Sequence, residues 1–435
     1  MKGQPKNILQ GPMPAVLVCT VPASEKETEE DRVAEMRSLM DTAGRMPVAE
    51  VRQHVAKITP RTYIGSGKVE ELVAAVKEHG AKEVVFDVQL SPSQQRNLED
   101  ETGCHVFDYD ELILEIFAQN ARTHQARLAV ELASMEYTRS RLKRMWTHLD
   151  RQSVGTSGMG SGALSGTGEK QIEMDRRLVR KRIQVLRDEL AAISARTDRV
   201  VESREAFTVC LVGYTNAGKS TLMNALTNAE VLAQDRLFAT LDTRTSRLFL
   251  PQLLRGGNVV LSDTVGFIRN LPPSLIASFH ATLAEVREAD LLLHVVDASS
   301  PVMDQQIAAV ESVLTGIGAG EVPVLMVFNK CDRAYSKTLI AAYRKRYQRS
   351  MAVSALLGDG LDDLRQLIAD QVLARSAKLR VTYAVTDGAF DAFLRSRATI
   401  LDETAEDDRM VVTISADPRL QADLDDHPAC TVTAV

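Results

Sequence analysis

A short glycine-rich segment near the middle of the 435-residue chain limits its fold more than any other part of the sequence. The segment is Gly213-Tyr-Thr-Asn-Ala-Gly-Lys-Ser220, it fits G-x-x-x-x-G-K-[ST], and the apolar run Phe207–Val212 directly precedes it. In such a loop, backbone N–H groups surround the phosphates, Lys219 supplies a positive charge and the hydroxyl of Ser220 binds magnesium. A strand, this loop and a following helix predict an α/β domain that binds a nucleoside triphosphate.

Two later segments select the base as guanine. The run Asn329-Lys-Cys-Asp332 ends the apolar strand predicted at Val322–Phe328, and the carboxylate of Asp332 can accept hydrogen bonds from guanine N1–H and its amine. Adenine offers no such pair and would leave the carboxylate unsatisfied. Ser354-Ala-Leu356 fits the loop that backs the base. The order of the motifs therefore favours a GTPase over a P-loop ATPase or kinase.

The γ-phosphate and magnesium are predicted to contact two further segments. Asp263-Thr-Val-Gly266 fits D-x-x-G, with Asp263 in the outer shell of magnesium and the Gly266 N–H at the γ-phosphate. Phe238-Ala-Thr-Leu-Asp242 lies where GTPases carry their first switch, and Thr240 is the predicted second magnesium ligand. Thr243 and Thr245 are nearby alternatives. We expect magnesium as the cofactor.

The predicted GTP-binding residues all belong to the five segments described above. They are Gly213, Tyr214, Thr215, Asn216, Ala217, Gly218, Lys219, Ser220, Phe238, Ala239, Thr240, Leu241, Asp242, Asp263, Thr264, Val265, Gly266, Asn329, Lys330, Cys331, Asp332, Ser354, Ala355 and Leu356.

No catalytic residue stands out. Phe267 follows Gly266, where Ras-like enzymes place a glutamine that orients the attacking water, and a phenyl ring has no donor or acceptor for that task. Packing beside the switch is an equally good interpretation of Phe267. Asn216 is a candidate ligand for a potassium ion at the phosphates, or it braces the loop through its own backbone.

The sequence divides into four regions. Residues 1–120 alternate short apolar runs with amphipathic stretches and predict a small α/β domain. Residues 121–205 predict a helical hairpin, 206–376 a GTPase domain with a parallel sheet, and 377–435 a small α+β domain. In the last region we expect strands at Arg380–Thr386 and Met410–Ser415, a helix at Ala389–Leu401 and an acidic turn at Glu403–Asp408.

The hairpin is predicted from two runs of heptads separated by a glycine- and serine-rich loop, Ser153–Gly168. The first run comprises Leu128, Met135, Leu142 and Leu149, and the second Ile172, Val179, Leu186, Ile193 and Val200. Residues 121–205 carry 17 basic and 11 acidic side chains, whereas the regions on either side are net acidic. Arg176, Arg177, Arg180 and Lys181 are therefore candidate contacts to RNA, with a plain linker and a solvated basic surface as the alternatives.

Other features exclude some classes of protein. No apolar run approaches the 18 residues of a membrane span. The five cysteines are scattered singly, which favours a reduced cytoplasmic protein without a metal cage or disulfide framework. Gly65-Ser-Gly-Lys68 lacks the spacing of a second phosphate loop and fits a helix start better, although a second nucleotide site there is the alternative. We expect a monomer.

Several strings outside the GTPase motifs resemble the HflX-type GTPase family. They are Thr62-Tyr-Ile-Gly-Ser-Gly-Lys68, Leu90-Ser-Pro-Ser-Gln94, Leu112-Ile-Leu-Glu-Ile-Phe-Ala118, Glu131-Leu-Ala133 and the Gly168-Glu169 segment with Asp175-Arg-Arg177. The chain departs from the family pattern at Tyr109-Asp110, where Arg-Thr is usual, and at Thr243-Arg244, where Pro-Thr is usual. The loop Ala163–Lys170 also differs. The chain looks like a divergent member.

The resemblance implies a GTP-hydrolysing factor that binds the large ribosomal subunit, and that can split or rescue stalled ribosomes under stress. It also implies that the chain associates with ribosomes in the cytoplasm. An alternative is a signalling or assembly switch whose hairpin binds a protein partner. A third hypothesis is an RNA-modifying GTPase. The sequence contains no paired catalytic carboxylates and no cysteine-based cofactor motif that would support it.

Overall fold

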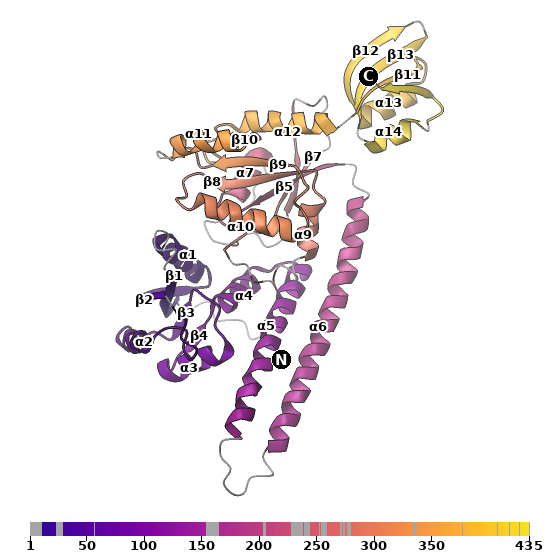
Figure 1. Ribbon diagram of the computed structural model, residues 1–435. Coiled ribbons are helices and arrows are strands. Elements are labelled where there is room, and N and C mark those ends of the chain that lie inside the picture. The colour runs from indigo at the N-terminus through magenta and orange to yellow at the C-terminus, as the bar shows by residue number, and fades with distance from the viewer. Residues whose placement is uncertain are drawn as a thin grey trace.

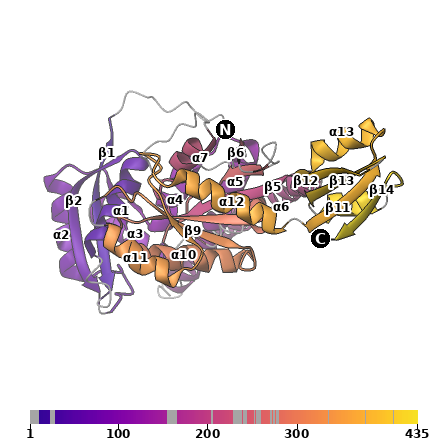
Figure 2. The same cartoon turned by 90° about the horizontal axis from the view of Figure 1, so that it is seen from above.

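The computed structural model describes most of the chain. The described residues are 11–22, 29–55, 57–153, 165–202, 206–227, 238, 244–251, 253, 259–269, 272, 275, 280–333, 336–375, 377–406, 408–416, 418–425 and 427–434. The N-terminal domain lies beside the upper part of a long helical hairpin, and the GTPase domain covers them both (Figure 1). The C-terminal domain lies at the far end of the GTPase domain from the N-terminal domain (Figure 2). Among the described residues, no helix is long and apolar enough to cross a membrane.

The N-terminal domain is a four-stranded parallel sheet in the order β2-β1-β3-β4, flanked by helices. Its elements are β1 (Met13–Pro22), α1 (Glu29–Thr42), β2 (Arg45–Val55), α2 (Ser66–Glu78), β3 (Glu83–Phe86), α3 (Pro92–Thr102), β4 (His105–Phe107) and α4 (Tyr109–Asn120). Local sequence fixes the ends of α3, because Ser91 and Gln94 form a capping box and Gly103 ends the helix with positive φ. The predicted α/β architecture is confirmed. The edge strand β2 was not predicted, because its polar residues Glu50, Arg52 and Gln53 interrupt the apolar pattern.

The hairpin consists of α5 (His124–Ser153) and α6 (Ser165–Glu202). Leu128, Ile183 and Leu186 are buried in the seam between the helices, and Val179 and Ile193 pack against it. Arg182 and Arg187 of α6 pair with Glu131 and Glu136 of α5 at 2.7 and 2.6 Å. The predicted pairing of two helices is confirmed, but the loop was predicted five residues too long, because α5 includes Ser153 and α6 begins at Ser165. The side chains of Leu142, Leu149, Ile172 and Val200 lie outside the described ones.

The GTPase domain is built on a six-stranded sheet in the order β10-β9-β8-β5-β7-β6. Its elements are β5 (Phe207–Gly213), α7 (Lys219–Thr227), β6 (Arg244–Leu248), β7 (Val259–Asp263), α9 (His280–Arg287), β8 (Leu291–Asp297), α10 (Met303–Gly316), β9 (Val324–Asn329), α11 (Ser336–Arg346), β10 (Ser350–Ala352) and α12 (Leu361–Arg375). Five strands are parallel, as the continuous apolar runs predict. The sixth, β6, pairs antiparallel with β7 at the edge, and its alternating exposure explains why no apolar run marks it.

The C-terminal domain is an antiparallel sheet in the order β12-β13-β11-β14 with two helices. Its elements are β11 (Ala377–Ala384), α13 (Gly388–Arg397), β12 (Thr399–Glu406), β13 (Arg409–Ala416), α14 (Pro418–Asp425) and β14 (Cys430–Ala434). The acidic turn predicted at Glu403–Asp408 is wrong over Glu403–Glu406, which belongs to β12. An edge strand tolerates exposed carboxylates because its outer side faces solvent, so acidity alone does not indicate a turn.

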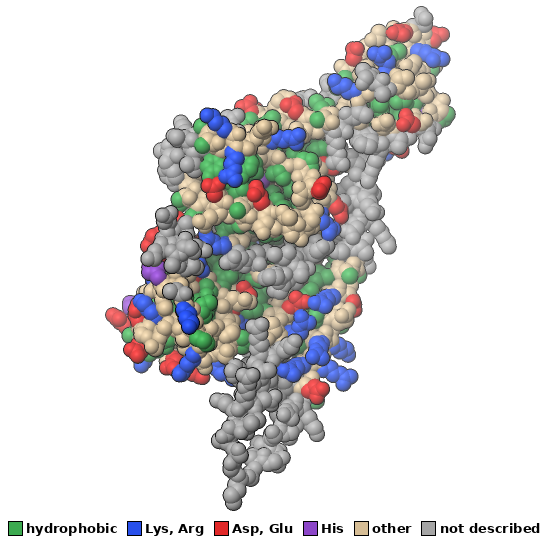
Figure 3. Space-filling view, in the orientation of Figure 1, with side chains coloured by type: hydrophobic (Ala, Val, Ile, Leu, Met, Phe, Trp, Pro, Cys, Tyr) green, Lys and Arg blue, Asp and Glu red, His purple; other side chains and the backbone are tan. Residues whose placement is uncertain are grey.

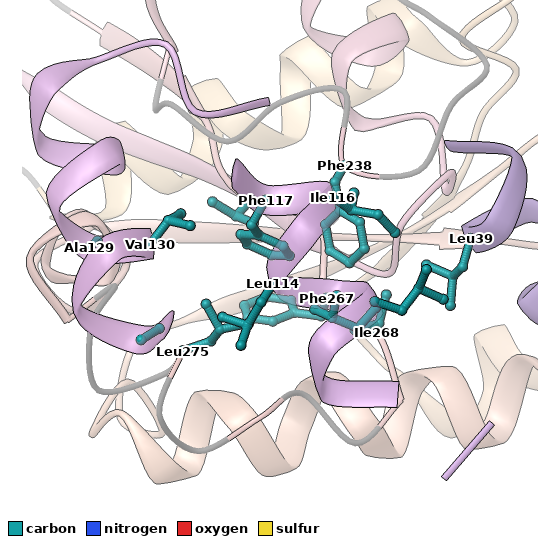
Figure 4. Close-up of a cluster of buried hydrophobic side chains, with 14 of the residues drawn as sticks. Leu39, Leu114, Ile116, Phe117, Ala129, Val130, Phe238, Phe267, Ile268 and Leu275 are labelled. Carbon is teal, nitrogen blue, oxygen red and sulfur yellow. The ribbon is translucent and has the colours of Figure 1, made fainter. Parts of the chain in front are cut away.

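One buried apolar cluster joins three of these parts. It includes Phe117 of α4, Ala129 of α5, and Phe238, Phe267 and Leu275 of the GTPase domain. Figure 4 shows these side chains lying together around α4. The rings of Phe117 and Phe238 are 4.6 Å apart. The GTPase domain, the hairpin and the N-terminal domain therefore share part of one core.

Candidate nucleotide-binding site

The glycines of the phosphate loop stand where no side chain fits. The loop runs from the end of β5 to the start of α7, as predicted. Gly213 has a φ of +152°, and a Cβ there would lie 2.2 Å from the carbonyl oxygen of Val295. Gly218 has a φ of +90°, and a Cβ would lie 2.3 Å from Nδ2 of Asn329. The loop is thus pressed against the ends of β8 and β9 and presents its backbone to the phosphate side.

Lys219 is the buried cation of the site. Its Nζ donates to the carbonyl oxygens of Gly213 and Tyr214 at 3.1 and 2.9 Å. Burial lowers the pKa of Lys219 to about 8, partly opposed by the charge of Asp263. A nearby anion would offset the free-energy cost of burying the charge of Lys219. The geometry therefore favours a phosphate beside Lys219.

Ser220 and Asp263 bring two oxygen ligands together. The hydroxyl of Ser220 donates to Oδ2 of Asp263 at 2.6 Å, and Asp263 is fully buried at the end of β7. Hydroxyl and carboxylate oxygens are the ligands that magnesium prefers. The donor set therefore fits magnesium.

The predicted base-binding residues meet at the ends of β9 and β10. Asn329 is buried and bridges two loops, since its Nδ2 donates to Ala217 O at 2.9 Å and its Oδ1 accepts from Ala355 N at 3.0 Å. Lys330 donates to the carbonyl oxygen of Asn216 at 2.8 Å and to Asp297 at 2.7 Å.

Asp332 is exposed, and its Oδ1 accepts from the hydroxyl of Ser354 at 2.7 Å. The carboxylate is thus oriented while its other oxygen remains available for guanine. Leu356 is 78% exposed beside it.

Some residues of the predicted set have side chains directed elsewhere. The hydroxyl of Thr264 donates to Leu211 O at 2.7 Å, and Val265 lies in the interdomain core. Phe238 has a φ of +57° and is buried against Phe117, so only its backbone remains for the nucleotide. Ala239, Thr240, Leu241 and Asp242 lie outside the described residues, as does the alternative Thr243.

Phe267 packs in the interdomain core and is only 2% exposed. Its backbone N–H donates to Gly213 O at 3.1 Å, and its carbonyl accepts from Thr215 N at 2.7 Å. The packing interpretation of Phe267 is therefore confirmed, and the side chain cannot orient water.

Asn216 has a φ of +59°, a conformation that asparagine adopts more readily than most residues. Its side chain is exposed. The backbone explains an asparagine at this position, and the predicted potassium contact stays a prediction.

Sequence reasoning missed a hydrogen-bonded junction between the phosphate loop and the N-terminal domain. The hydroxyl of Tyr214 donates to Glu35 of α1 and accepts from Arg269 N at 2.7 Å. Tyr109 of α4 donates to Arg269 O at 2.6 Å. Position 109 was noted as a departure from the family pattern, but no signal pointed to Glu35.

The basic residues of the hairpin divide into two groups. Arg177, Arg180 and Lys181 are exposed, Arg176 is partly exposed, and none of the four forms an ion pair with another described residue. A group of basic side chains on α6 is visible in Figure 3. Arg141, one of the 17 basic residues of region 121–205, instead pairs with the fully buried Asp108 and so attaches α5 to the N-terminal domain.

Three family models match successive parts of the chain. Residues 30–118 match the family model described as the N-terminal region of GTP-binding GTPases, and residues 120–204 match its middle region. Residues 208–330 match the model described as 50S ribosome-binding GTPase. GTPase HflX of Magnetococcus marinus is 40% identical over 424 residues, which is 96% of each chain. GTPase HflX of Escherichia coli is 40% identical over 407 residues, covering 91% of this chain and 92% of that protein.

This chain belongs to the HflX family of GTPases. As a member of that family it binds GTP and hydrolyses it. A solved structure titled as a complex of SsGBP with GDP covers 82% of this HflX chain and 98% of its own, with 23% identity and a TM-score of 0.47.

Proposed function

We propose that GTP binds with its phosphates at Lys219 and its base at Asp332, and that the 24 residues predicted above form its surroundings. Ser220 and Thr240 would be the protein ligands of magnesium, with Asp263 in its outer shell, held there by its hydrogen bond from Ser220. When bound, magnesium neutralises charge on the β- and γ-phosphates. Lys219 bonds to Gly213 in the phosphate loop, and Asp332 accepts a hydrogen bond from Ser354 in the loop that backs the base. These two positions support this orientation of GTP.

We further propose that the chain binds the large ribosomal subunit through the basic side of α6, by Arg176, Arg177, Arg180 and Lys181. The observation that carries the proposal is the shared core. Phe238 and Phe267 pack with Phe117 of α4 and Ala129 of α5, so the hairpin and both switch segments are in one packed cluster. A force or contact on the hairpin can thus bias the arrangement of the switches.

In hydrolysis, the oxygen of water forms a bond to the γ-phosphorus while the bond to the β–γ bridging oxygen breaks, and GDP leaves with that electron pair. Lys219 lies where it can stabilise the growing charge. Since Phe267 is buried and cannot orient water, we propose slow hydrolysis by the isolated protein and faster hydrolysis on the ribosome. Subunit splitting or rescue of stalled ribosomes under stress is the finer role proposed for this cycle.

The test is co-sedimentation with purified large subunits in the presence of a non-hydrolysable GTP analogue or GDP, together with single-turnover hydrolysis with and without subunits. We expect binding with the analogue and weaker binding with GDP, and stimulated hydrolysis. The proposal would be contradicted if the protein sedimented equally well without large subunits, or if large subunits did not raise its rate of GTP hydrolysis.

One observation favours a second candidate, a switch whose hairpin binds a protein. Met174 and Leu178 are 57% and 60% exposed on α6, and Val185 lies on the same side of the helix, opposite the α5 seam. An apolar row of this kind is buried more readily by protein than by RNA. Replacing Met174 and Leu178 by Gln separates the candidates. If the variant binds large subunits more weakly but with the same salt dependence as the parent, the apolar row contacts protein. If its binding is unchanged, the contact of the basic residues with RNA is favoured.

A further inference from the structure

Thr215 of the phosphate loop carries a buried hydroxyl that the fold does not satisfy. The residue is 7% exposed, and its Oγ1 has no hydrogen-bond partner within the described part of the chain. Buried polar groups are nearly always paired, because an unpaired one costs free energy. The other hydroxyls of the phosphate loop and of D-x-x-G are bonded, namely those of Tyr214, Ser220 and Thr264. The hydroxyl of Thr215 is therefore the one that these two segments hold in reserve for a ligand.

The side chain of Thr215 lies at the γ-phosphate end of the site. A Cβ on Gly266 would lie 2.9 Å from Cγ2 and 3.1 Å from Cα of Thr215. The same Cβ would lie 3.0 Å from Nζ of Lys219. Gly266 is the residue whose N–H is predicted to meet the γ-phosphate, so Thr215 borders the place where that group would bind. Its Oγ1 is attached to the same carbon as Cγ2 and lies in the same neighbourhood.

The backbone ties Thr215 to the position at which Ras-like enzymes carry their glutamine. The N–H of Thr215 donates to the carbonyl oxygen of Phe267 at 2.7 Å, and the N–H of Phe267 donates to the carbonyl oxygen of Gly213 at 3.1 Å. The ring of Phe267 is buried in the interdomain core and has no donor or acceptor. Thr215 therefore brings a hydroxyl next to the place where a glutamine amide orients water in Ras-like enzymes.

Water can reach this side of the loop. Thr215, Asn216 and Asp297 line a cleft of about 210 Å³ between α1, the phosphate loop and α10. One water molecule occupies roughly 30 Å³ in the liquid, so the cleft has room for several. The attacking water therefore has a route to Thr215 that does not cross the packed core around Phe267.

We infer that Thr215 is a catalytic residue of GTP hydrolysis, whose hydroxyl holds the attacking water. A hydroxyl has one donor and two acceptor sites. It donates to an oxygen of the γ-phosphate and accepts from the water, which turns a lone pair of that water toward phosphorus. The inference rests on the proposed position of the phosphates at Lys219 and names the group that takes the place of the glutamine.

The hydroxyl of Thr215 positions the water and is not consumed. The water oxygen forms its bond to the γ-phosphorus while the bond from phosphorus to the β–γ bridging oxygen breaks, and GDP leaves with that electron pair. Both protons of the water leave with the phosphate product, and Thr215 keeps its own proton. Because the hydroxyl is already fixed by the fold, the enzyme spends little free energy on orienting it during the reaction.

The test is Thr215→Val in the full-length chain, which keeps the branched shape and removes the hydroxyl. We expect the single-turnover rate of GTP hydrolysis to fall roughly 10²- to 10³-fold, with and without large ribosomal subunits, as when one preorganised donor to a transition state is removed. The affinity for a non-hydrolysable GTP analogue should fall by no more than roughly 10-fold, the net contribution of one neutral hydrogen bond. Isothermal titration of the isolated chain measures that affinity.

A second measurement does not depend on turnover. GDP with aluminium fluoride imitates the transferring phosphoryl group and its attacking water. Thr215→Val should weaken the binding of this complex by a larger factor than the binding of the GTP analogue, because the hydroxyl contacts the water as well as the phosphate. The affinity for GDP alone should not change.

Two further variants separate the hydroxyl from the shape of the side chain. Thr215→Ser keeps the hydroxyl and loses only Cγ2, so its hydrolysis rate should lie much closer to the parent than that of Thr215→Val. Thr208→Val is the matched control. Thr208 is 9% exposed near the start of β5, at the opposite end of the strand from the phosphate loop, and its replacement should leave the rate and the affinities unchanged.

The inference is overturned if Thr215→Val hydrolyses GTP at the parental rate, or if Thr215→Ser is as slow as Thr215→Val. It is also overturned if analogue affinity and hydrolysis rate fall by the same factor, since the residue would then serve binding alone. A parent chain that binds neither the analogue nor GDP would instead contradict the proposed function.

Discussion

The two ends of the nucleotide site are supported by different parts of the molecule. At the base end, Asn329, Asp332 and Ser354 are held by contacts within the GTPase domain. At the γ-phosphate end, Phe267 and Arg269 depend on the N-terminal domain for their packing and hydrogen bonds. The difference suggests that recognition of guanine is independent of the rest of the chain, whereas the response to the third phosphate is shared between domains.

The largest expected effect is at the base end. Asp332→Asn exchanges an acceptor for a donor facing guanine N1–H and removes two charge-assisted hydrogen bonds worth roughly 1.5–3 kcal/mol each. We expect about 10²- to 10⁴-fold weaker binding of GTP, and a relative gain for xanthosine nucleotides, whose base offers an acceptor there.

If the two ends are independent, Asp332→Asn weakens the GTP analogue and GDP by the same factor in a fluorescence titration. Asp362→Asn is the matched control, because Asp362 is 95% exposed on α12 of the same domain. A change in the analogue-to-GDP ratio would break the comparison, and unchanged GTP affinity would remove Asp332 from the site.

The next effect concerns the interdomain core. Phe267→Ala deletes a buried ring, a change that typically costs about 3–5 kcal/mol. We expect amide protons of α4 to exchange faster in the variant, because α4 packs on this ring, while the strands around Asn329 keep their protection. Hydrogen exchange followed by mass spectrometry measures both regions.

Phe390→Ala is the control for Phe267→Ala, since Phe390 lies in the separate core of the C-terminal domain. Its effect should stay within that domain. Slow exchange of α4 in Phe267→Ala would show that the N-terminal domain is held by other contacts.

The base end and its motifs could be predicted from sequence because each residue acts within a short segment that follows a strand. Asn329 and Asp332 are three positions apart, and their geometry follows from the end of β9. The junction could not be predicted in this way. Tyr109 and Arg269 are 160 residues apart, and their contact depends on how two domains pack. Strand β12 was missed for a related reason, since pairing with β13 determines its structure more than its acidic composition does.

A smaller effect is expected on the hairpin. Replacing Arg176, Arg177, Arg180 and Lys181 by Ala should weaken binding to large ribosomal subunits and reduce its salt dependence. Counterion release gives a slope of roughly −0.9 per phosphate contact on duplex DNA, so the loss of two contacts is measurable by sedimentation at several salt concentrations. GTP and GDP affinities of the isolated protein should not change.

Arg182→Ala with Arg187→Ala is the control for the hairpin, because these arginines pair with Glu131 and Glu136 of α5. This control should reduce the stability of the hairpin and leave the salt slope near that of the parent. If the variant with all four basic residues replaced has the same salt dependence of subunit binding as the parent, these residues are a solvated basic surface and not RNA contacts.

The smallest effect is expected at Asn216, which lies between the two ends. We expect hydrolysis by the parent to be a few-fold faster in potassium than in sodium, since a cation beside the phosphates stabilises the charge of the transition state. Asn216→Ala should abolish the difference. Single-turnover rates in both salts test this, and GDP affinity in each salt is the control. Equal rates in the parent would leave Asn216 with its backbone role alone.

The buried pairing of Arg141 with Asp108 has a mechanical consequence. Asp108 immediately precedes α4, which begins at Tyr109, and the same carboxylate also accepts from Tyr137 of α5. Helix α5 ends at Ser153, 12 residues after Arg141, and so extends about 18 Å beyond this attachment. A rotation of one degree about Arg141 moves the end of the helix by about 0.3 Å, taking 1.5 Å of rise per residue. The attachment is next to Tyr109 in sequence, so a rotation of the hairpin reaches Tyr109 as a small shift, on the scale over which a hydrogen bond forms or breaks.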